Sequence, residues 1–61
     1  MNKPLYTFKE TCEILHIGRD RLYKFMEQKL IKGFRIGSTW RFPAYEIDRF
    51  IRAQMDAQEN L

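Results

Sequence analysis

Residues 18–27 read Gly18-Arg19-Asp20-Arg21-Leu22-Tyr23-Lys24-Phe25-Met26-Glu27, and this stretch decides the fold. Its apolar residues Leu22, Phe25 and Met26 stand at i, i+3 and i+4, which places them on one face of a helix. The remaining faces carry mostly charged and hydrogen-bonding groups. The pattern therefore predicts a short helix that packs on a core along its apolar face and exposes a largely cationic surface.

A second helix is predicted directly before this one. The run Thr7-Phe8-Lys9-Glu10 fits a capping box, with Thr7 as the N-cap and Glu10 reaching back from the third helical position. The helix should end near Leu15, and residues 16–18 form the turn, with Gly18 as the next N-cap. Two short helices joined by about three residues are a helix-turn-helix unit. The inward face of the first helix is expected to consist of Phe8, Thr11, Cys12 and Leu15.

Residues 28–33 look like a connector, from which Leu30 and Ile31 are expected to return to the core. Beyond it the apolar period changes from helical to alternating, first around Phe34 and then around Trp40. Two short alternating runs on either side of a Gly-Ser-Thr sequence predict a β-hairpin.

The register of this hairpin can be argued from side-chain parity. A two-residue loop, Gly37-Ser38, would pair Phe34 with Arg41 and mix apolar and cationic side chains on one face. A three-residue loop adds Thr39 to the tip, pairs Ile36 with Trp40 and Phe34 with Phe42, and keeps these four apolar side chains together. We therefore predict the three-residue tip, with Arg35 and Arg41 sharing the opposite face.

A last helix is predicted after Pro43, which suits a helix boundary. Its apolar residues have the spacing of a helix that packs back on the core: Ile47, Phe50, Ile51 and Met55. For the tail at residues 54–61, helical continuation and fraying both remain open. The whole chain, residues 1–61, is expected to be one domain, mainly α-helical with a small β-hairpin.

Length and composition exclude several classes of function. A chain of 61 residues can bury only a small core, which leaves little room for an enzyme pocket. The single cysteine, Cys12, and the single histidine, His16, exclude a disulfide framework and a self-contained zinc site. We interpret Cys12 as a packing residue and His16 as a solvated turn residue. We expect no catalytic residue, no metal and no cofactor.

The expected location is the bacterial cytoplasm, in association with the nucleoid when the protein is bound to DNA. No apolar run approaches the length of about 18 residues that a membrane span needs. Residues 1–4, Met-Asn-Lys-Pro, do not lead into the apolar region of a signal peptide. We therefore expect no contact with a membrane.

The positive charge is concentrated in the middle of the chain. The sequence carries 11 Lys and Arg residues against 8 Asp and Glu residues, a net charge of +3. Residues 19–41 hold seven of the basic residues and only Asp20 and Glu27 of the acidic ones, so this third has a net charge of +5 and the rest −2. Such a concentration is typical of a nucleic-acid-binding face. An ordinary soluble basic domain is the simpler alternative.

Three segments together carry a resemblance to a known family. They are the capped first helix and short turn over residues 5–26, the run Phe34-Arg35-Ile36-Gly37-Ser38-Thr39-Trp40-Arg41-Phe42, and residues 47–51. This pattern resembles the excisionase-type, MerR-like winged helix-turn-helix domain. The resemblance covers nearly the whole chain. The family usually has two alanines at Thr11 and Cys12, a glycine at His16, Ser or Thr at Gly18 and a polar cap at Tyr45.

The resemblance implies a winged helix-turn-helix protein that binds double-stranded DNA. It would be either an excisionase, which binds and bends attachment-site DNA to direct a site-specific recombinase toward excision, or a related regulator. The second helix would enter the major groove and the wing the adjacent minor groove. A recombinase and neighbouring copies on DNA are further expected partners. The matching positions are Arg19, Asp20, Tyr23 and Lys24 in the helix and Arg35, Ser38, Thr39 and Arg41 in the wing.

The chemistry of the helix residues is compatible with these roles. Arg19 can contact a guanine edge with two hydrogen bonds, whereas Arg21 and Lys24 suit phosphates. Tyr23 can bond a phosphate or pack on a thymine methyl group. Asp20 can orient Arg19 or accept from a cytosine amino group. The alternative is that these are ordinary solvated charges on an amphipathic helix.

Two further choices concern the wing and the class of function. Trp40 can stack on a base or pack on the core, and its alternation with Phe42 favours the core. A protein-interaction adaptor built on the same fold is the rival to a DNA-binding protein. The basic band favours DNA.

Overall fold

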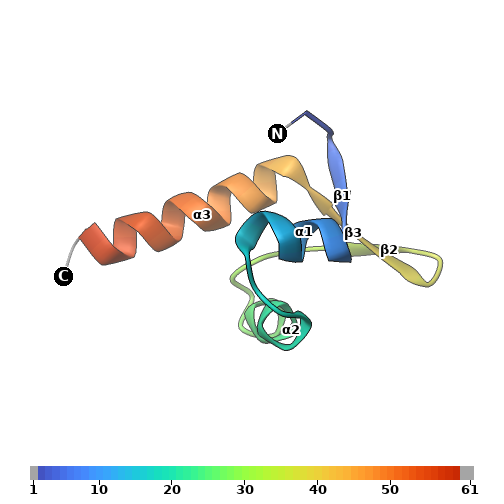
Figure 1. Cartoon of the computed structure of the whole chain (residues 1–61), viewed down its shortest axis with the longest axis horizontal. Helices are drawn as coiled ribbons and strands as arrows, with labels where there is room; N and C mark the ends of the chain where they lie inside the picture. Colours follow the sequence, from blue (N-terminus) through green and yellow to red (C-terminus); the bar gives the residue numbers. More distant parts are fainter. Residues whose placement is uncertain (1, 60–61) are drawn as a thin grey trace.

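The computed structural model describes residues 2–59 and forms a winged helix-turn-helix, as expected (Figure 1). Helices α1 and α2 make the helix-turn-helix, and strands β2 and β3 make the wing. In chain order the elements are β1 (Leu5–Thr7), α1 (Phe8–Leu15), α2 (Arg19–Glu27), β2 (Phe34–Ile36), β3 (Thr39–Pro43) and α3 (Ala44–Glu59).

The wing is part of a three-stranded antiparallel sheet in the order β1-β3-β2. Strand β1 was not anticipated, because three residues are too few to show a periodic pattern. It pairs along β3, with Tyr6 opposite Phe42, and this pairing attaches the start of the chain to the wing. The first amide of α3 is also satisfied here, since the Ala44 N–H donates to the Pro4 carbonyl at 2.9 Å.

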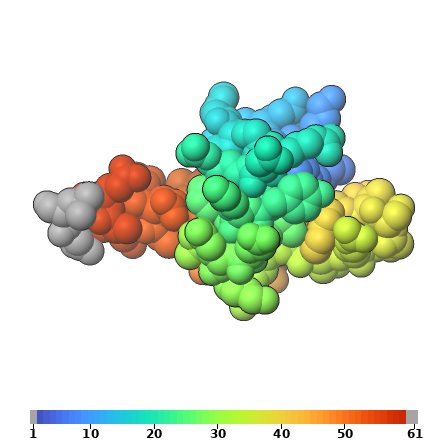
Figure 2. Space-filling model, turned by 90° about the horizontal axis from the view of Figure 1, so that it is seen from below, coloured from blue at the N-terminus to red at the C-terminus, as the bar shows by residue number. Residues whose placement is uncertain are grey.

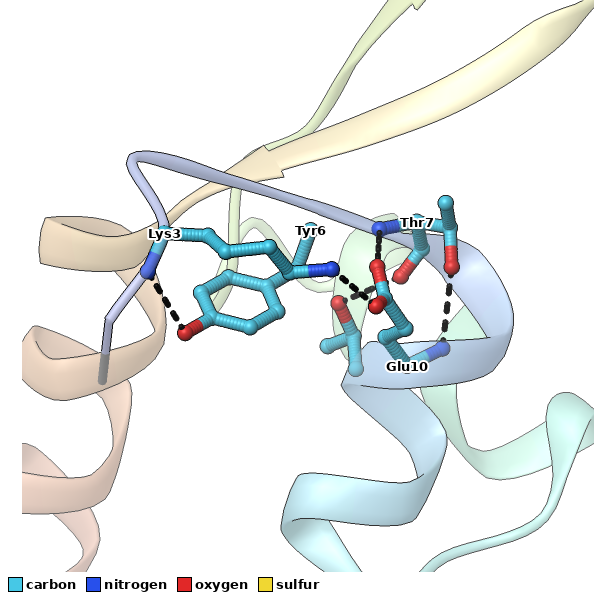
Figure 3. A network of polar contacts seen from close by, with 5 residues as sticks. Lys3, Tyr6, Thr7 and Glu10 are labelled. Carbon is cyan, nitrogen blue, oxygen red and sulfur yellow. Dashed lines mark hydrogen bonds and ion pairs between the residues drawn. The ribbon is translucent and has the colours of Figure 1, made fainter.

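The predicted capping box begins α1 (Figure 3). The Glu10 N–H donates to Thr7 Oγ1 at 3.1 Å, and the Thr7 N–H donates to Glu10 Oε1 at 2.9 Å. The Lys3 ammonium pairs with the other Glu10 oxygen. Lys3, and then the Thr7 N–H, lower the pKa of Glu10 from 4.5 to about 2, so the carboxylate stays ionised and the cap persists at neutral pH.

Both helices of the helix-turn-helix end in a Schellman turn around a left-handed residue that is not glycine. His16 has φ 55° after α1, and the Ile17 N–H donates to the Cys12 carbonyl at 3.0 Å. Lys29 has φ 64° after α2, and the Leu30 N–H donates to the Phe25 carbonyl at 2.9 Å. The chain therefore turns sharply at two positions where a side chain is disfavoured.

The register predicted for the hairpin is wrong. Strand β2 pairs with β3 through Ile36 opposite Thr39, Arg35 opposite Trp40 and Phe34 opposite Arg41, so the loop has two residues. Gly37 has φ 64° as the first loop residue, which a type II′ turn requires and glycine adopts freely. The Thr39 hydroxyl donates to the Ile36 carbonyl at 3.0 Å and closes this turn.

In the observed register, the four apolar side chains of the hairpin lie on two faces of the wing and not on one. Phe34 and Ile36 lie on the face of the wing away from Trp40 and Phe42, and are 42% and 55% exposed. Arg35 and Arg41 lie on different faces as well. Because the outer face of this sheet is not covered, nothing forces the apolar side chains of β2 inward, and their alternation does not set the register.

The core lies between the sheet and the three helices. Phe42 of β3, Leu22 of α2 and Ile47 of α3 are fully buried, and Thr11 is buried on α1. Other buried members are Tyr6, Phe8, Ile31 and Phe50, with Cys12, Leu15, Phe25, Met26 and Ile51 packed partly against them. The expected inward faces of α1 and α2 are confirmed.

Two core assignments need correction. Ile31 is buried but Leu30 is 40% exposed, since the turn at Lys29 directs only one of the two side chains inward. Met55 is 57% exposed, because α3 continues as a helix through Glu59 and runs beyond the core it packs on. Figure 2 shows α3 projecting on one side of the molecule and the wing on the other, with α2 between them.

We expect Gly33→Ala to destabilise the fold. A Cβ at Gly33 would lie 2.6 Å from Cε2 of the buried Phe42 ring, so the connector or the ring must move. Overpacking of this kind lowers the free energy of unfolding by about 1–3 kcal/mol. Urea unfolding measures it, with Gly18→Ala as the control, because a Cβ at Gly18 meets no atom within 4 Å. Equal losses in the two variants would contradict the close packing at Gly33.

We expect His16→Gly to stabilise the fold. Glycine adopts φ 55° without the steric penalty of a side chain, so the free energy of unfolding should rise by about 1 kcal/mol. The control is Glu13→Gly in the same helix, which should lower it by about 1 kcal/mol, because there glycine only adds unfolded-state entropy. Thermal unfolding of both variants measures this, and a loss at His16 would refute the strained turn.

Candidate nucleic-acid interface

A cleft lies between the start of α1, the helix α2 and the wing. Five of the residues predicted to contact DNA line it: Arg19, Tyr23, Ser38, Thr39 and Arg41. Its other lining residues are Thr7, Phe8, Lys9 and Trp40. The fold thus brings the first turn of α2 and the tip of the wing onto one surface, although they lie far apart in the sequence.

Arg19 rests on an aromatic ring of the first helix. Its guanidinium carbon lies 5.7 Å from the centroid of the Phe8 ring, and the Tyr23 ring lies 4.7 Å from the same ring. Phe8 is buried, so its ring is a fixed support, and the cation–π contact restrains the direction of the arginine. Among residues 2–59, Asp20 forms no ion pair with Arg19, so Phe8, and not Asp20, is the group that orients Arg19 here.

The remaining predicted helix residues lie outside the cleft. Asp20, Arg21 and Lys24 are exposed on α2. Arg21 follows Arg19 by two residues, which turns it about 200° around the helix axis. Arg21 therefore faces the opposite flank of α2 from Arg19, and the two cannot contact the same base pair.

The two arginines of the wing are both restrained through Trp40. The Arg35 guanidinium carbon lies 4.9 Å from the centroid of the Trp40 ring, and Arg41 Nη1 donates to the Trp40 carbonyl at 2.8 Å. Trp40 is half-buried and stacks on Phe42 at 6.3 Å between centroids, so the expected core packing of Trp40 is confirmed. The wing presents Arg35 beside the indole and Arg41 in the cleft.

Lys9 is a candidate that the sequence reasoning missed. It is exposed in the first turn of α1 and lines the cleft next to Arg19. The first helix of a helix-turn-helix crosses the DNA backbone, which gives a cation at this position a phosphate to meet. The signal was its place in the first turn of α1, two residues after the Thr7 cap and outside the apolar stripe.

Within residues 2–59, no group of three or more His, Cys, Asp or Glu side chains is arranged to hold a metal ion. Burial raises the pKa of the Cys12 thiol, which keeps it in its unreactive protonated form. None of the helices in the described part of the chain has both the length and the apolar character that crossing a membrane requires.

The fold and this cleft define a winged helix-turn-helix protein of the nucleic-acid-binding class. The chain belongs to the helix-turn-helix domain family, whose family model matches residues 5–55. A domain of this family identifies the protein as a DNA-binding protein. Searches among curated proteins and among solved structures gave no significant match.

We expect Arg19→Ala and Arg41→Ala each to weaken binding to duplex DNA, and Arg41→Ala, which removes a backbone contact, also to reduce its salt dependence. Binding that neutralises phosphates weakens as salt rises, and losing one such contact lowers the log–log slope by about 1. Fluorescence anisotropy at several salt concentrations measures both quantities. Arg52→Ala is the control, because Arg52 lies on α3 and pairs with Asp48. A flat slope for the unaltered protein, or an equal effect of Arg52→Ala, would contradict this interface.

Proposed function

We propose that this protein is an excisionase: it binds and bends attachment-site DNA and so directs a site-specific recombinase toward excision. The observation that carries the DNA-contacting part of the proposal is the shared cleft, which joins Arg19 and Tyr23 of α2 to Ser38, Thr39 and Arg41 of the wing. The excision role rests on the resemblance of residues 5–26, 34–42 and 47–51 to excisionase-type domains.

In the proposed complex, α2 lies in the major groove and the wing in the adjacent minor groove. Arg19, held on Phe8, contacts a guanine edge, and Tyr23 beside it contacts a phosphate or a thymine methyl group. Arg21, Lys24 and Lys9 contact phosphates. The small tip at Gly37 and Ser38 lets Arg41 approach the sugar-phosphate backbone.

Bending is supported by the shape and chemistry of the wing. Contacts in two successive grooves favour a duplex that curves toward the protein. Proteins that bend DNA from the minor groove often insert apolar side chains between base steps, and Ile36 beside the wing tip is an exposed residue of that type.

The proposal includes further macromolecular partners. One domain of this size contacts few base pairs, so useful specificity requires several copies on neighbouring sites or a recombinase bound alongside. We propose that both occur, and that the protein acts in the cytoplasm, where such DNA is found. No catalytic activity is part of the proposal, because the recombinase performs the chemistry.

Two other functions use the same surfaces differently. A small transcriptional regulator of a mobile element would use the same helix and wing on promoter DNA. A protein-interaction adaptor would not need the cations of the cleft. The concentration of Arg19, Lys9 and Arg41 around one cleft favours DNA over the adaptor.

Footprinting and recombination assays test the excision role. The DNA flanking the gene's own element is footprinted with and without the neighbouring recombinase, and the excised and integrated products are measured in parallel. We expect protected sites beside the attachment site, an anomalous mobility that shows a bend, and a shift toward excision that Arg19→Ala removes.

The outcomes separate the alternatives. Protection of promoter DNA with no change in the direction of recombination would establish the regulator in place of the excisionase. Retention of recombinase binding by the Arg19→Ala and Arg41→Ala variants, without any DNA footprint for the unaltered protein, would establish the adaptor.

A further inference from the structure

Glu46 is a buried acidic residue that the DNA-contacting surface does not use. It lies in the first turn of α3 and is only 8% exposed. Arg49 approaches it from the same helix with two nitrogens, Nη2 at 2.8 Å from Oε1 and Nε at 3.1 Å from Oε2. The Arg49 guanidinium, as the largest influence, lowers the pKa of Glu46, so the carboxylate is ionised at neutral pH.

This ion pair holds the connector between α2 and the wing. The Lys32 N–H donates to Glu46 Oε1 at 3.0 Å, and Arg49 Nη2 donates to the Leu30 carbonyl at 3.4 Å. Between these two bonds Ile31 inserts into the core with 1% exposure. Residues 30–32 are thus attached to α3 by two polar contacts, and Ile31 anchors them in the core.

The connector determines how the two DNA-contacting elements sit relative to each other. It begins at the left-handed turn at Lys29, where α2 ends, and leads into β2 at Phe34. Just before β2, Gly33 packs against the Phe42 ring. A shift of the connector therefore changes the placement of α2 against the wing.

Burying the Glu46 carboxylate is a costly way to gain stability, because removing its charge from water offsets much of its attraction to Arg49, whose side chain stays half-exposed. A carboxylate that accepts both a backbone N–H and a planar guanidinium is, however, strongly directional. The arrangement is suited to setting geometry more than to adding stability.

We propose that Glu46 and Arg49 are a positioning pair that fixes the wing relative to the recognition helix, so that both reach DNA at once. The inference rests on the proposed two-part contact of α2 and the wing with DNA. Neither residue is assigned a contact with DNA; both act through the connector.

The first test does not involve DNA. Residual dipolar couplings report the orientation of α2 relative to β2 and β3 in solution, and amide exchange reports the Lys32 N–H. We expect Glu46→Gln and Glu46→Ala to change the α2-to-wing orientation and to speed exchange at Lys32. Asp48→Asn is the matched control, because it removes an ion pair of the same helix, with Arg52, that touches no connector atom.

The second test is a double-mutant cycle on DNA binding. With Glu46 intact we expect Arg41→Ala to weaken binding about tenfold, and in the Glu46→Ala background less than about threefold, since the wing is no longer held in place. The effect of Arg19→Ala should be the same in both backgrounds. If Glu46→Ala only destabilised the fold, it would lower the folded fraction. The fold-changes in affinity caused by Arg41→Ala and by Arg19→Ala would then each be the same in the two backgrounds. Glu46→Gln, which keeps the size of the side chain, replaces Glu46→Ala if the latter does not fold.

Each outcome is decisive. Unchanged couplings in both Glu46 variants, or an effect of Arg41→Ala that is equal in the two backgrounds, would overturn the positioning role while leaving DNA binding intact. Absence of salt-dependent DNA binding by the unaltered protein would overturn the proposed function instead, and the couplings would still decide whether Glu46 sets the connector.

Discussion

Burial of the Phe42 ring is the interaction on which the rest of the structure depends. The ring is completely buried at the centre of the sheet, where β3 pairs with β1 through Tyr6. It touches Phe8 of the first helix edge-on, with 6.1 Å between centroids, and stacks on Trp40. The backbone of the connector passes so close at Gly33 that no side chain fits there. One side chain thereby joins the wing, the helix-turn-helix and the connector in a chain of 61 residues that has no disulfide to do so.

The same aromatic cluster extends from the core to the candidate interface. Phe8 contacts Phe42 on the inside, and Arg19 and Tyr23 on the outside. Trp40 packs on Phe42 and holds Arg35 over its ring. The cations are therefore supported by rigid rings, which reduces the side-chain entropy lost when they meet DNA. In a protein with so small a core, the residues that stabilise the fold and those that position the binding groups are largely the same.

The hairpin shows where pattern and local chemistry disagreed. Side-chain alternation predicts a loop of three residues only if all the apolar side chains of the wing lie on one face. The outer face of the sheet is not covered, so Phe34 and Ile36 can remain there, and the glycine at Gly37 selects the two-residue turn. Turn chemistry acts on two or three residues directly, whereas parity depends on a burial pattern that only the assembled domain defines. Leu30 and Met55 were misassigned for the same reason, since apolar type does not by itself specify burial.

The sequence by itself determined the features that arise from contacts a few residues apart: the capping box of Thr7 and Glu10, the apolar stripes of α1 and α2, the helix-turn-helix and the presence of a wing. Hydrogen bonds and helical periodicity at these short separations can be seen in a pattern of residues. Only the tertiary structure decided the cleft that joins Arg19 to Arg41, the place of Lys9 beside it, and the third strand. It also decided the attachment of Lys32 to Glu46, 14 residues away, and of Leu30 to Arg49, 19 residues away. These contacts depend on how the elements pack against Phe42, and no local pattern carries that information.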